Sequence, residues 1–163
     1  MVKHFTTSVF IVSKKEGEWF ILLIHHRKFD RWMVPGGHVE NFENPVTCAI
    51  REVKEETGLK IRLFSFIHKK LYATDAEWLL PPEYFYEQII PAGSKEAEHV
   101  HLDFAYISFC DNMAFVKNDA ETKNIEWFSI EKANALNLFD GTEKIIADLK
   151  EKLDQNLITY ETS

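Results

Sequence analysis

Hydrophobic and polar positions along this chain follow two periods, one typical of strands and one typical of helices. Segment 5–13 is rich in Thr, Val, Ile and Phe and predicts a strand, and the apolar segment 19–25 predicts a second. The polar stretch 14–18 between them contains a glycine, so the pair resembles a hairpin. Further strands are expected at 60–73 (long and bent), 83–92, 99–110 and 123–128.

One helix is predicted with both of its ends. Asn44 is a good N-cap, Pro45 at the first helical position loses no needed N–H, and Gly58 suits the position just past the last turn. At about 100° per residue, one side of this helix is apolar and should face the core. The residues of this stripe are Val46, Ala49, Ile50, Val53 and Thr57.

The C-terminal third predicts two more helices. Ser129 should cap a short helix at 130–136, and an amphipathic helix should run from about 143 to 153. The core positions of the second helix are Ile145, Ile146, Leu149 and Leu153. The order of elements predicts an α/β fold, an α/β/α sandwich around a mixed sheet. We expect one domain over 1–155 and a frayed tail at 156–163.

The predicted helix at 45–57 carries Glu52, Glu55 and Glu56 within an arc of roughly 100°, away from its apolar stripe. Carboxylates so close together repel one another, and a bound cation would offset that repulsion. The alternative is a solvated acidic face, which a lone Glu-x-x-Glu-Glu pattern would normally indicate. The surrounding residues decide between these two interpretations.

Those residues form a longer pattern between Gly37 and Leu59. It reads Gly-x5-Glu-x7-Arg-Glu-Val-x-Glu-Glu-x-Gly-Leu. All seven fixed residues and both apolar positions resemble the signature box of the MutT-like Nudix hydrolases. A chance match in a chain of this length is on the order of one in a million by composition. The Pro-Gly-Gly sequence that leads into the box is also typical of the family.

The resemblance implies a Nudix-type α/β/α sandwich and a Mg²⁺-dependent hydrolase, with Mn²⁺ as a substitute metal. It implies that Glu52, Glu55, Glu56 and the carbonyl of Gly36 are the metal ligands. Carboxylate and carbonyl oxygens are what Mg²⁺ prefers. The expected reaction is cleavage of a diphosphate linkage by metal-activated water.

Other acidic residues have expected roles beside these ligands. Glu43 and Arg51 match the pair of the box usually described as structural, so we expect Glu43 to be structural first and a metal ligand second. A fifth catalytic carboxylate often comes from a loop before the last strand, where this chain has Glu121. The alternative for Glu121 is a solvated loop acid. Glu52 and Glu121 both remain open as the general base.

Basic residues cluster shortly before the glycine pair. Arg27 and Arg31 belong to the most basic stretch of the chain and are candidates for contacts to the substrate. The alternative is a strand end that reaches solvent.

Histidines alternate at the start of the strand predicted at 99–110. His99 and His101 share one face with Asp103 and could bind a metal. Because the carboxylates already supply a metal site, we prefer sheet histidines with ordinary partners or contacts to the substrate.

Composition narrows the class of ligand. A formal net charge of −7 argues against a nucleic-acid duplex as partner, so we expect a small nucleotide held through metal. No signal-peptide pattern and no apolar run of membrane length are present, so we expect a cytoplasmic enzyme without a membrane partner. Cys48 and Cys110 are expected to be reduced core thiols. The oligomeric state stays open, with a homodimer as one alternative.

The substrate is less defined than the reaction. The marks outside the box that accompany ADP-ribose, dinucleoside polyphosphate, NADH and coenzyme A hydrolases are not recognisable here, which leaves nucleoside triphosphates and nucleotide-sugar-like compounds. One alternative is a non-catalytic nucleotide-sensing Nudix domain, although its box would be eroded. Another is an isopentenyl-diphosphate-isomerase-like enzyme, but neither Cys48 nor Cys110 fits the catalytic cysteine of that class.

Overall fold

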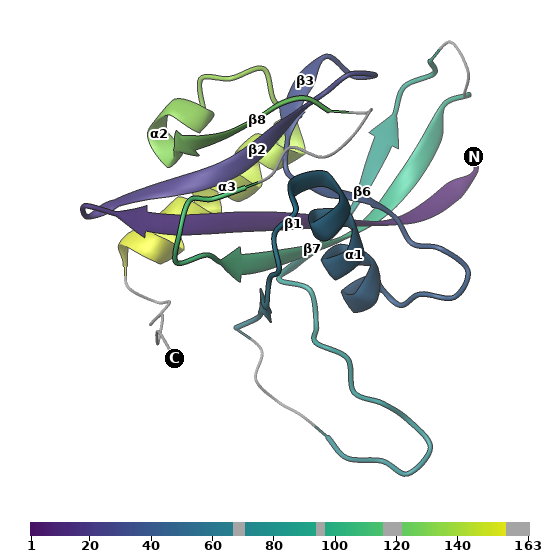
Figure 1. Cartoon of the computed structure of the whole chain (residues 1–163). Helices are drawn as coiled ribbons and strands as arrows, with labels where there is room; N and C mark the ends of the chain where they lie inside the picture. The colour runs from purple at the N-terminus through teal and green to yellow at the C-terminus, as the bar shows by residue number, and fades with distance from the viewer. Residues whose placement is uncertain (67–70, 94–96, 116–121, 156–163) are drawn as a thin grey trace.

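A computed structural model describes residues 1–66, 71–93, 97–115 and 122–155, which form one mixed sheet with helices on both faces (Figure 1). The strands are β1 (Lys3–Lys15), β2 (Glu18–His26), β3 (Arg31–Met33), β4 (Gly36–His38), β5 (Leu63–Phe64), β6 (Tyr84–Ile90), β7 (His99–Phe109) and β8 (Thr122–Ser129). The helices are α1 (Pro45–Thr57), α2 (Ile130–Ala133) and α3 (Asp140–Asp154). The predicted tail at 156–163 lies outside the described residues.

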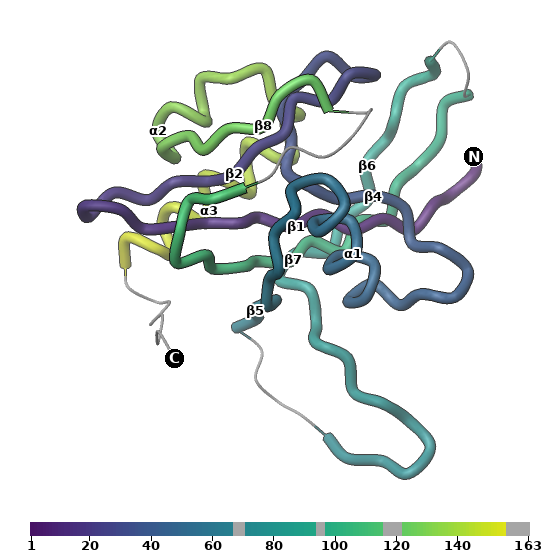
Figure 2. Tube along the Cα trace, viewed as in Figure 1, coloured from purple at the N-terminus to yellow at the C-terminus, as the bar shows by residue number. Residues whose placement is uncertain are grey.

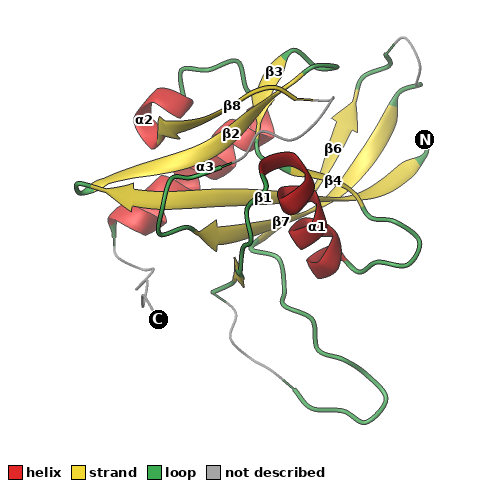
Figure 3. Ribbon diagram, viewed as in Figure 1, coloured by secondary structure: helices red, strands yellow, loops and turns green. Residues whose placement is uncertain are grey.

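Strand β1 is the centre of the sheet. It pairs antiparallel with β2 through the predicted hairpin and antiparallel with the short β4. It also pairs parallel with β7, in register from Lys3 beside Val100 to Val12 beside Phe109. Strands β5 and β6 extend the sheet beyond β7, and β8 pairs with β2 (Figure 3). The predicted mixed sheet is therefore confirmed.

The two faces of β1 contribute to two hydrophobic layers, because successive side chains point to opposite sides of a strand. Val9 and Ile11 are fully buried in the layer that includes α1. Phe10 and Val12 are fully buried in the layer that includes α2 and α3. Figure 1 shows α1 on one face of the sheet and α2 and α3 on the other. The α/β/α sandwich is thus the observed architecture.

Helix α1 has the ends that the sequence predicted. The Asn44 side chain accepts from the N–H of Thr47 at 3.0 Å, and the Thr47 hydroxyl oxygen accepts from the N–H of Asn44 at 3.1 Å. Gly58 has a φ of 70°, in the left-handed region, and its N–H donates to the carbonyl of Lys54. Both caps fix the length of the helix and the direction in which its glutamates point.

The predicted core stripe of α1 is wrong at one position. Ile50 is 39% exposed, whereas Cys48 and Glu56, which the stripe left out, are buried. Burial raises the pKa of the Cys48 thiol to about 11, in keeping with an unreactive core cysteine. The sheet and β4 approach the helix from the side of Cys48, so the buried arc is rotated from the one that hydrophobicity indicated.

The strand predicted at 60–73 is also wrong over most of its length. Of its described residues, 60–66 and 71–73, only Leu63 and Phe64 form a strand, which pairs with β7. Residues 71–83 belong to a long loop before β6 (Figure 2). Tyr72 in this loop is 91% exposed. Apolar residues alone do not make a strand when no neighbouring edge is available for their backbone groups.

The C-terminal helices differ from prediction at their boundaries. Ser129 is at the N-cap of α2, but its side chain makes no capping hydrogen bond and the helix ends at Ala133. Helix α3 begins at Asp140, with Phe139 at its N-cap, three residues before the predicted start. None of the described helices is both long and apolar enough to cross a membrane.

Candidate active site

At the corner between β4 and α1, the backbone of the glycine pair in β4 lies against the glutamate side chains of α1. The Gly36 N–H donates to Glu56 Oε2 at 2.9 Å, and the Glu56 residue is only 7% exposed. A Cβ added to Gly37 would overlap the carboxylate of Glu52. A side chain at Gly37 would therefore have to displace this carboxylate, whereas a Cβ at Gly36 would overlap the backbone carbonyl oxygen of Thr7, which cannot move aside.

Arg51 connects the loop before α1 to the glutamates of the helix. Its guanidinium donates to both carboxylate oxygens of Glu43, at 2.6 and 2.9 Å. Its Nη1 also donates to Glu52 at 2.9 Å and to Glu55 at 3.1 Å. The Arg51 contact lowers the pKa of Glu43 to about 2, and the same ion pair raises the pKa of Arg51. Glu43 thus has the structural contact expected of it.

The three glutamates of α1 have different surroundings. Burial raises the pKa of Glu52, while the neighbouring Arg51 opposes that rise. The Glu55 side chain is 60% exposed and reaches Arg51 across one helical turn. Glu56 is buried against the backbone of Gly36. The helix therefore presents carboxylates at three depths along the same arc.

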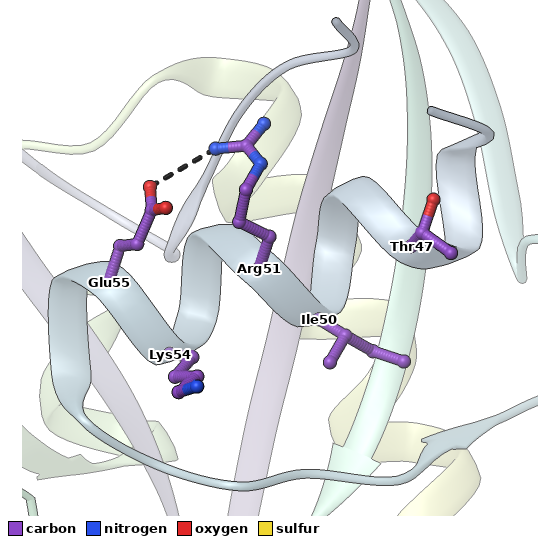
Figure 4. A pocket seen from close by; sticks show the side chains of 5 residues that line it. All are labelled: Thr47, Ile50, Arg51, Lys54 and Glu55. Carbon is purple, nitrogen blue, oxygen red and sulfur yellow. Dashed lines mark hydrogen bonds and ion pairs between the residues drawn. The ribbon is translucent and has the colours of Figure 1, made fainter. Parts of the chain in front are cut away.

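A shallow depression of about 460 Å³ lies on the outer side of α1 (Figure 4). Its lining residues are Thr47, Ile50, Arg51, Lys54 and Glu55. Figure 4 shows Arg51 and Glu55 joined on one side of the helix, while Ile50 and Lys54 point the other way. The depression touches the edge of the carboxylate arc and does not include the Gly36–Glu56 corner.

The donor set at this corner fits a hard divalent cation. Three carboxylates and the nearby backbone of Gly36 offer only oxygen ligands, which suit Mg²⁺ or Mn²⁺. Arg51 Nη1 bridges Glu52 and Glu55, so it partly neutralises the same charges that a cation would. Among the described residues, the close-set group of three metal-ligating side chains lies elsewhere, at His4, His99 and His101.

A family model described as the NUDIX domain matches residues 2–149. The chain belongs to the Nudix family. One curated relative is protein 111R of Invertebrate iridescent virus 3, whose name describes it as a hydrolase. It is 32% identical over 137 residues, which cover 82% of this chain and 64% of the relative. Human diphosphoinositol polyphosphate phosphohydrolase 3-alpha is 46% identical over 52 residues, 31% of this chain and 30% of the relative. The chain thus spans less than two thirds of either relative.

Solved structures of Nudix proteins have the same fold. A NUDIX-family hydrolase from Clostridium perfringens superposes with a TM-score of 0.69 at 31% identity, over 95% of this chain and 99% of that chain. A C. elegans Ap4A hydrolase superposes with a TM-score of 0.66 at 18% identity, over 93% of this chain and 98% of that chain. At 18% identity the second likeness shows the fold alone.

The predicted basic residues of this Nudix domain lie in the turn between β2 and β3 and in β3 itself. Arg27 is exposed. Arg31 donates to the carbonyl of Leu138 at 3.1 Å, and its guanidinium lies 5.0 Å from the ring centre of Phe139. Arg31 therefore holds the connection between α2 and α3, which is a structural contact that the sequence did not predict.

The Nudix box gives no information on two further residues, Glu121 and His4. Glu121 lies outside the described residues, although its neighbour Thr122 pairs with His26 at the end of β2. His4 was not singled out, because only the parallel register of β1 and β7 places it beside His101. An alternating His-x-His at a strand start was the one available signal.

Proposed function

We propose that this Nudix protein is a Mg²⁺-dependent pyrophosphohydrolase that cleaves a diphosphate linkage in a nucleoside triphosphate or related nucleotide. The observation that carries the proposal is the β4–α1 corner, where Gly36 binds Glu56 and the carboxylate of Glu52 occupies the space beside Gly37. The caps of α1 and the Arg51 ion pairs hold this arrangement in place.

The chain's residues would divide the work as follows. Glu52, Glu55, Glu56 and the carbonyl of Gly36 would hold the metal. When bound, Mg²⁺ supplies charge neutralisation for the phosphate oxygens and acidifies a water. Glu52 and Glu121 remain the two candidates for accepting the proton of the attacking water. Glu121→Gln tests one candidate alone: lost turnover with nucleotide binding retained would assign the base to Glu121, and unimpaired turnover would leave Glu52. Glu52→Gln is less informative, because it would also remove a metal ligand.

Charge favours a nucleotide over a more heavily phosphorylated substrate. The diphosphoinositol polyphosphate relatives act on a compound with many phosphate groups, and a site for such a compound needs a broad basic surface. This chain has a formal net charge of −7, and Arg31, one of its two candidate basic residues, is engaged with Leu138 and Phe139. Two or three phosphates held largely through metal fit this balance better.

The test is a substrate panel with Mg²⁺, with Mn²⁺ and with a chelator. It contains nucleoside triphosphates, nucleotide sugars, Ap4A, ADP-ribose and a diphosphoinositol polyphosphate. We expect metal-dependent release of phosphate or pyrophosphate from a nucleotide. Release only from the inositol compound would reject the nucleotide assignment, and nucleotide binding without turnover would point to a sensing domain.

The matching variant is Glu56→Gln, which keeps an oxygen to accept from Gly36 N–H but removes the charge. We expect turnover to fall by at least about a hundredfold, with thermal unfolding nearly unchanged. The control is Glu18→Gln, an exposed glutamate at the start of β2, at the β1–β2 hairpin turn. Wild-type turnover in Glu56→Gln would refute the metal assignment.

A further inference from the structure

Four histidines gather on the face of the sheet opposite α1. His4 in β1 is in register with His101 in β7, and His99 lies two residues earlier on the same side of β7. His38 in β4 packs its ring against His4 and His101, with centroids 5.2 and 5.0 Å apart. Gly37 faces Glu52 of α1, so its neighbour His38 points to the other face of the sheet.

The nitrogen positions of three of these rings suit one metal ion. The ligand atoms of His4, His99 and His101 all lie within 4.8 Å of one another. His99 Nε2 and His101 Nε2 are 3.1 Å apart. A tetrahedral metal about 2.0–2.1 Å from each nitrogen separates the nitrogens by about 3.3 Å. The His99–His101 pair is near this separation already, and binding would require the partly exposed His4 ring to move closer to the other two.

A hydrogen bond orients His99 as a ligand, and one nitrogen of His4 is left without a partner among the described residues. His99 Nδ1 lies 2.9 Å from the carbonyl oxygen of Ala97, which can only accept, so Nδ1 carries the proton and Nε2 keeps its lone pair. Such a bond fixes the tautomer and orientation of metal-bound histidines. His4 Nδ1 is buried and has no hydrogen-bond partner among the described residues. A buried nitrogen left this way costs free energy unless it binds something.

We propose that His4, His99 and His101 bind one transition-metal dication such as Zn²⁺. Neutral imidazoles favour Zn²⁺ and its first-row neighbours, whereas the carboxylates of α1 favour Mg²⁺. The chain would therefore hold two metals of different kinds on opposite faces of its sheet. Three histidines leave a fourth position for water or a ligand atom. This site goes beyond the proposed hydrolase function and does not depend on it.

The test is calorimetric titration of the untagged protein with Zn²⁺ in saturating Mg²⁺, which keeps the carboxylates occupied. We expect one equivalent of Zn²⁺ to bind with submicromolar affinity. His4→Asn and His101→Asn should each weaken Zn²⁺ binding by at least about a hundredfold. Removing only the hydrogen-bond partner of a metal ligand typically lowers metal affinity about 10–100-fold, and removing the ligand itself should lower it more. The visible spectrum of bound Co²⁺ should change in the same variants.

Two controls separate the site from the rest of the protein. His25→Asn replaces a histidine whose described contacts are with Asp30 and Trp32, and Glu55→Gln alters the carboxylate arc. Both should bind Zn²⁺ as the wild type does. Circular dichroism without metal should show that the His4 and His101 variants are folded; His99 is left unchanged because it is 5% exposed. Equal affinity in wild type and the His4→Asn/His101→Asn double variant, or loss of binding in Glu55→Gln, would overturn the proposal.

Discussion

Gly37 of β4 lies directly against a carboxylate of α1 in this Nudix domain. The space that a side chain would need is filled by the carboxylate of Glu52, while the next residue points to the histidine face. The absence of a side chain at this position therefore allows the Glu52 carboxylate to lie against β4, where Arg51 also contacts it. The sequence predicted the glutamate and the glycine, because the box contains both.

Gly37→Ala tests this constraint. The new methyl group would displace the Glu52 carboxylate, so we expect turnover with Mg²⁺ to fall by about a hundredfold, as misplacement of a catalytic group by about 1 Å can cause. Gly93→Ala is the matched control, since nothing lies within 4 Å of its added Cβ. Steady-state kinetics on the preferred nucleotide measure both variants, and an unimpaired Gly37→Ala would show that Glu52 can move freely.

Several residue contacts lay beyond sequence reasoning. The burial of Glu56 and the exposure of Ile50 depend on the angle at which α1 meets the sheet. Helical periodicity gives the width of an apolar face, but not which neighbour covers its margin. The position of His4 beside His101 could not be predicted either, because strand register brings together residues that are far apart in the chain.

At the scale of elements, the loop before α1 is fastened to the helix by charge. Glu43 accepts two hydrogen bonds from Arg51, and Arg51 also donates to the carbonyl of His38 at 3.2 Å. The capped helix and this ion pair together hold β4, the loop and α1 as one unit.

The helix caps and the Glu43–Arg51 pair were predicted, because both depend on local sequence. A strand over 60–73 was also predicted, but among its described residues the strand is limited to Leu63–Phe64, because strands need a partner edge that local sequence does not reveal.

Low pH should weaken the Glu43–Arg51 ion pair and so lower the stability of the protein. The pKa of Glu43 falls from 4.5 to about 2 on folding, so its contribution to stability is complete above pH 4.5 and declines as the pH falls toward 2. Glu43→Gln should therefore lower the free energy of unfolding at pH 6 and lose most of that difference by pH 3. Denaturant unfolding of both proteins across this range measures it. If the difference in free energy of unfolding between the two proteins did not change with pH, the Glu43–Arg51 ion pair could not be its cause.

At the scale of the whole molecule, stability comes from two layers around β1 rather than from the long loop after β5. Leu149 of α3 is fully buried in one layer, whereas Leu79 of the loop is 38% exposed. The layered architecture could be predicted from the order of elements, since strands and amphipathic helices have few ways to cover each other's apolar faces. A homodimer stays a prediction, to be measured by light scattering in solution.

Two leucine variants compare these regions. Leu149→Ala should lower the free energy of unfolding by about 2–5 kcal/mol, because it leaves a cavity under the sheet. Leu79→Ala should change it by about 0.5 kcal/mol or less. Urea unfolding of both variants gives the comparison. Equal losses would mean that the loop packs as tightly as the core.

The parallel pairing of β1 with β7 affects how the chain can fold while it is being synthesised. Thr6 and Asp103, whose side chains are hydrogen-bonded, are 97 residues apart in the chain. The first strand can form its hairpin with β2 early, but its other edge has no partner until most of the chain has been synthesised. Pairings of such long range fold slowly and leave strand edges open to association in the meantime. The nascent chain should therefore depend most on chaperones before β7 emerges.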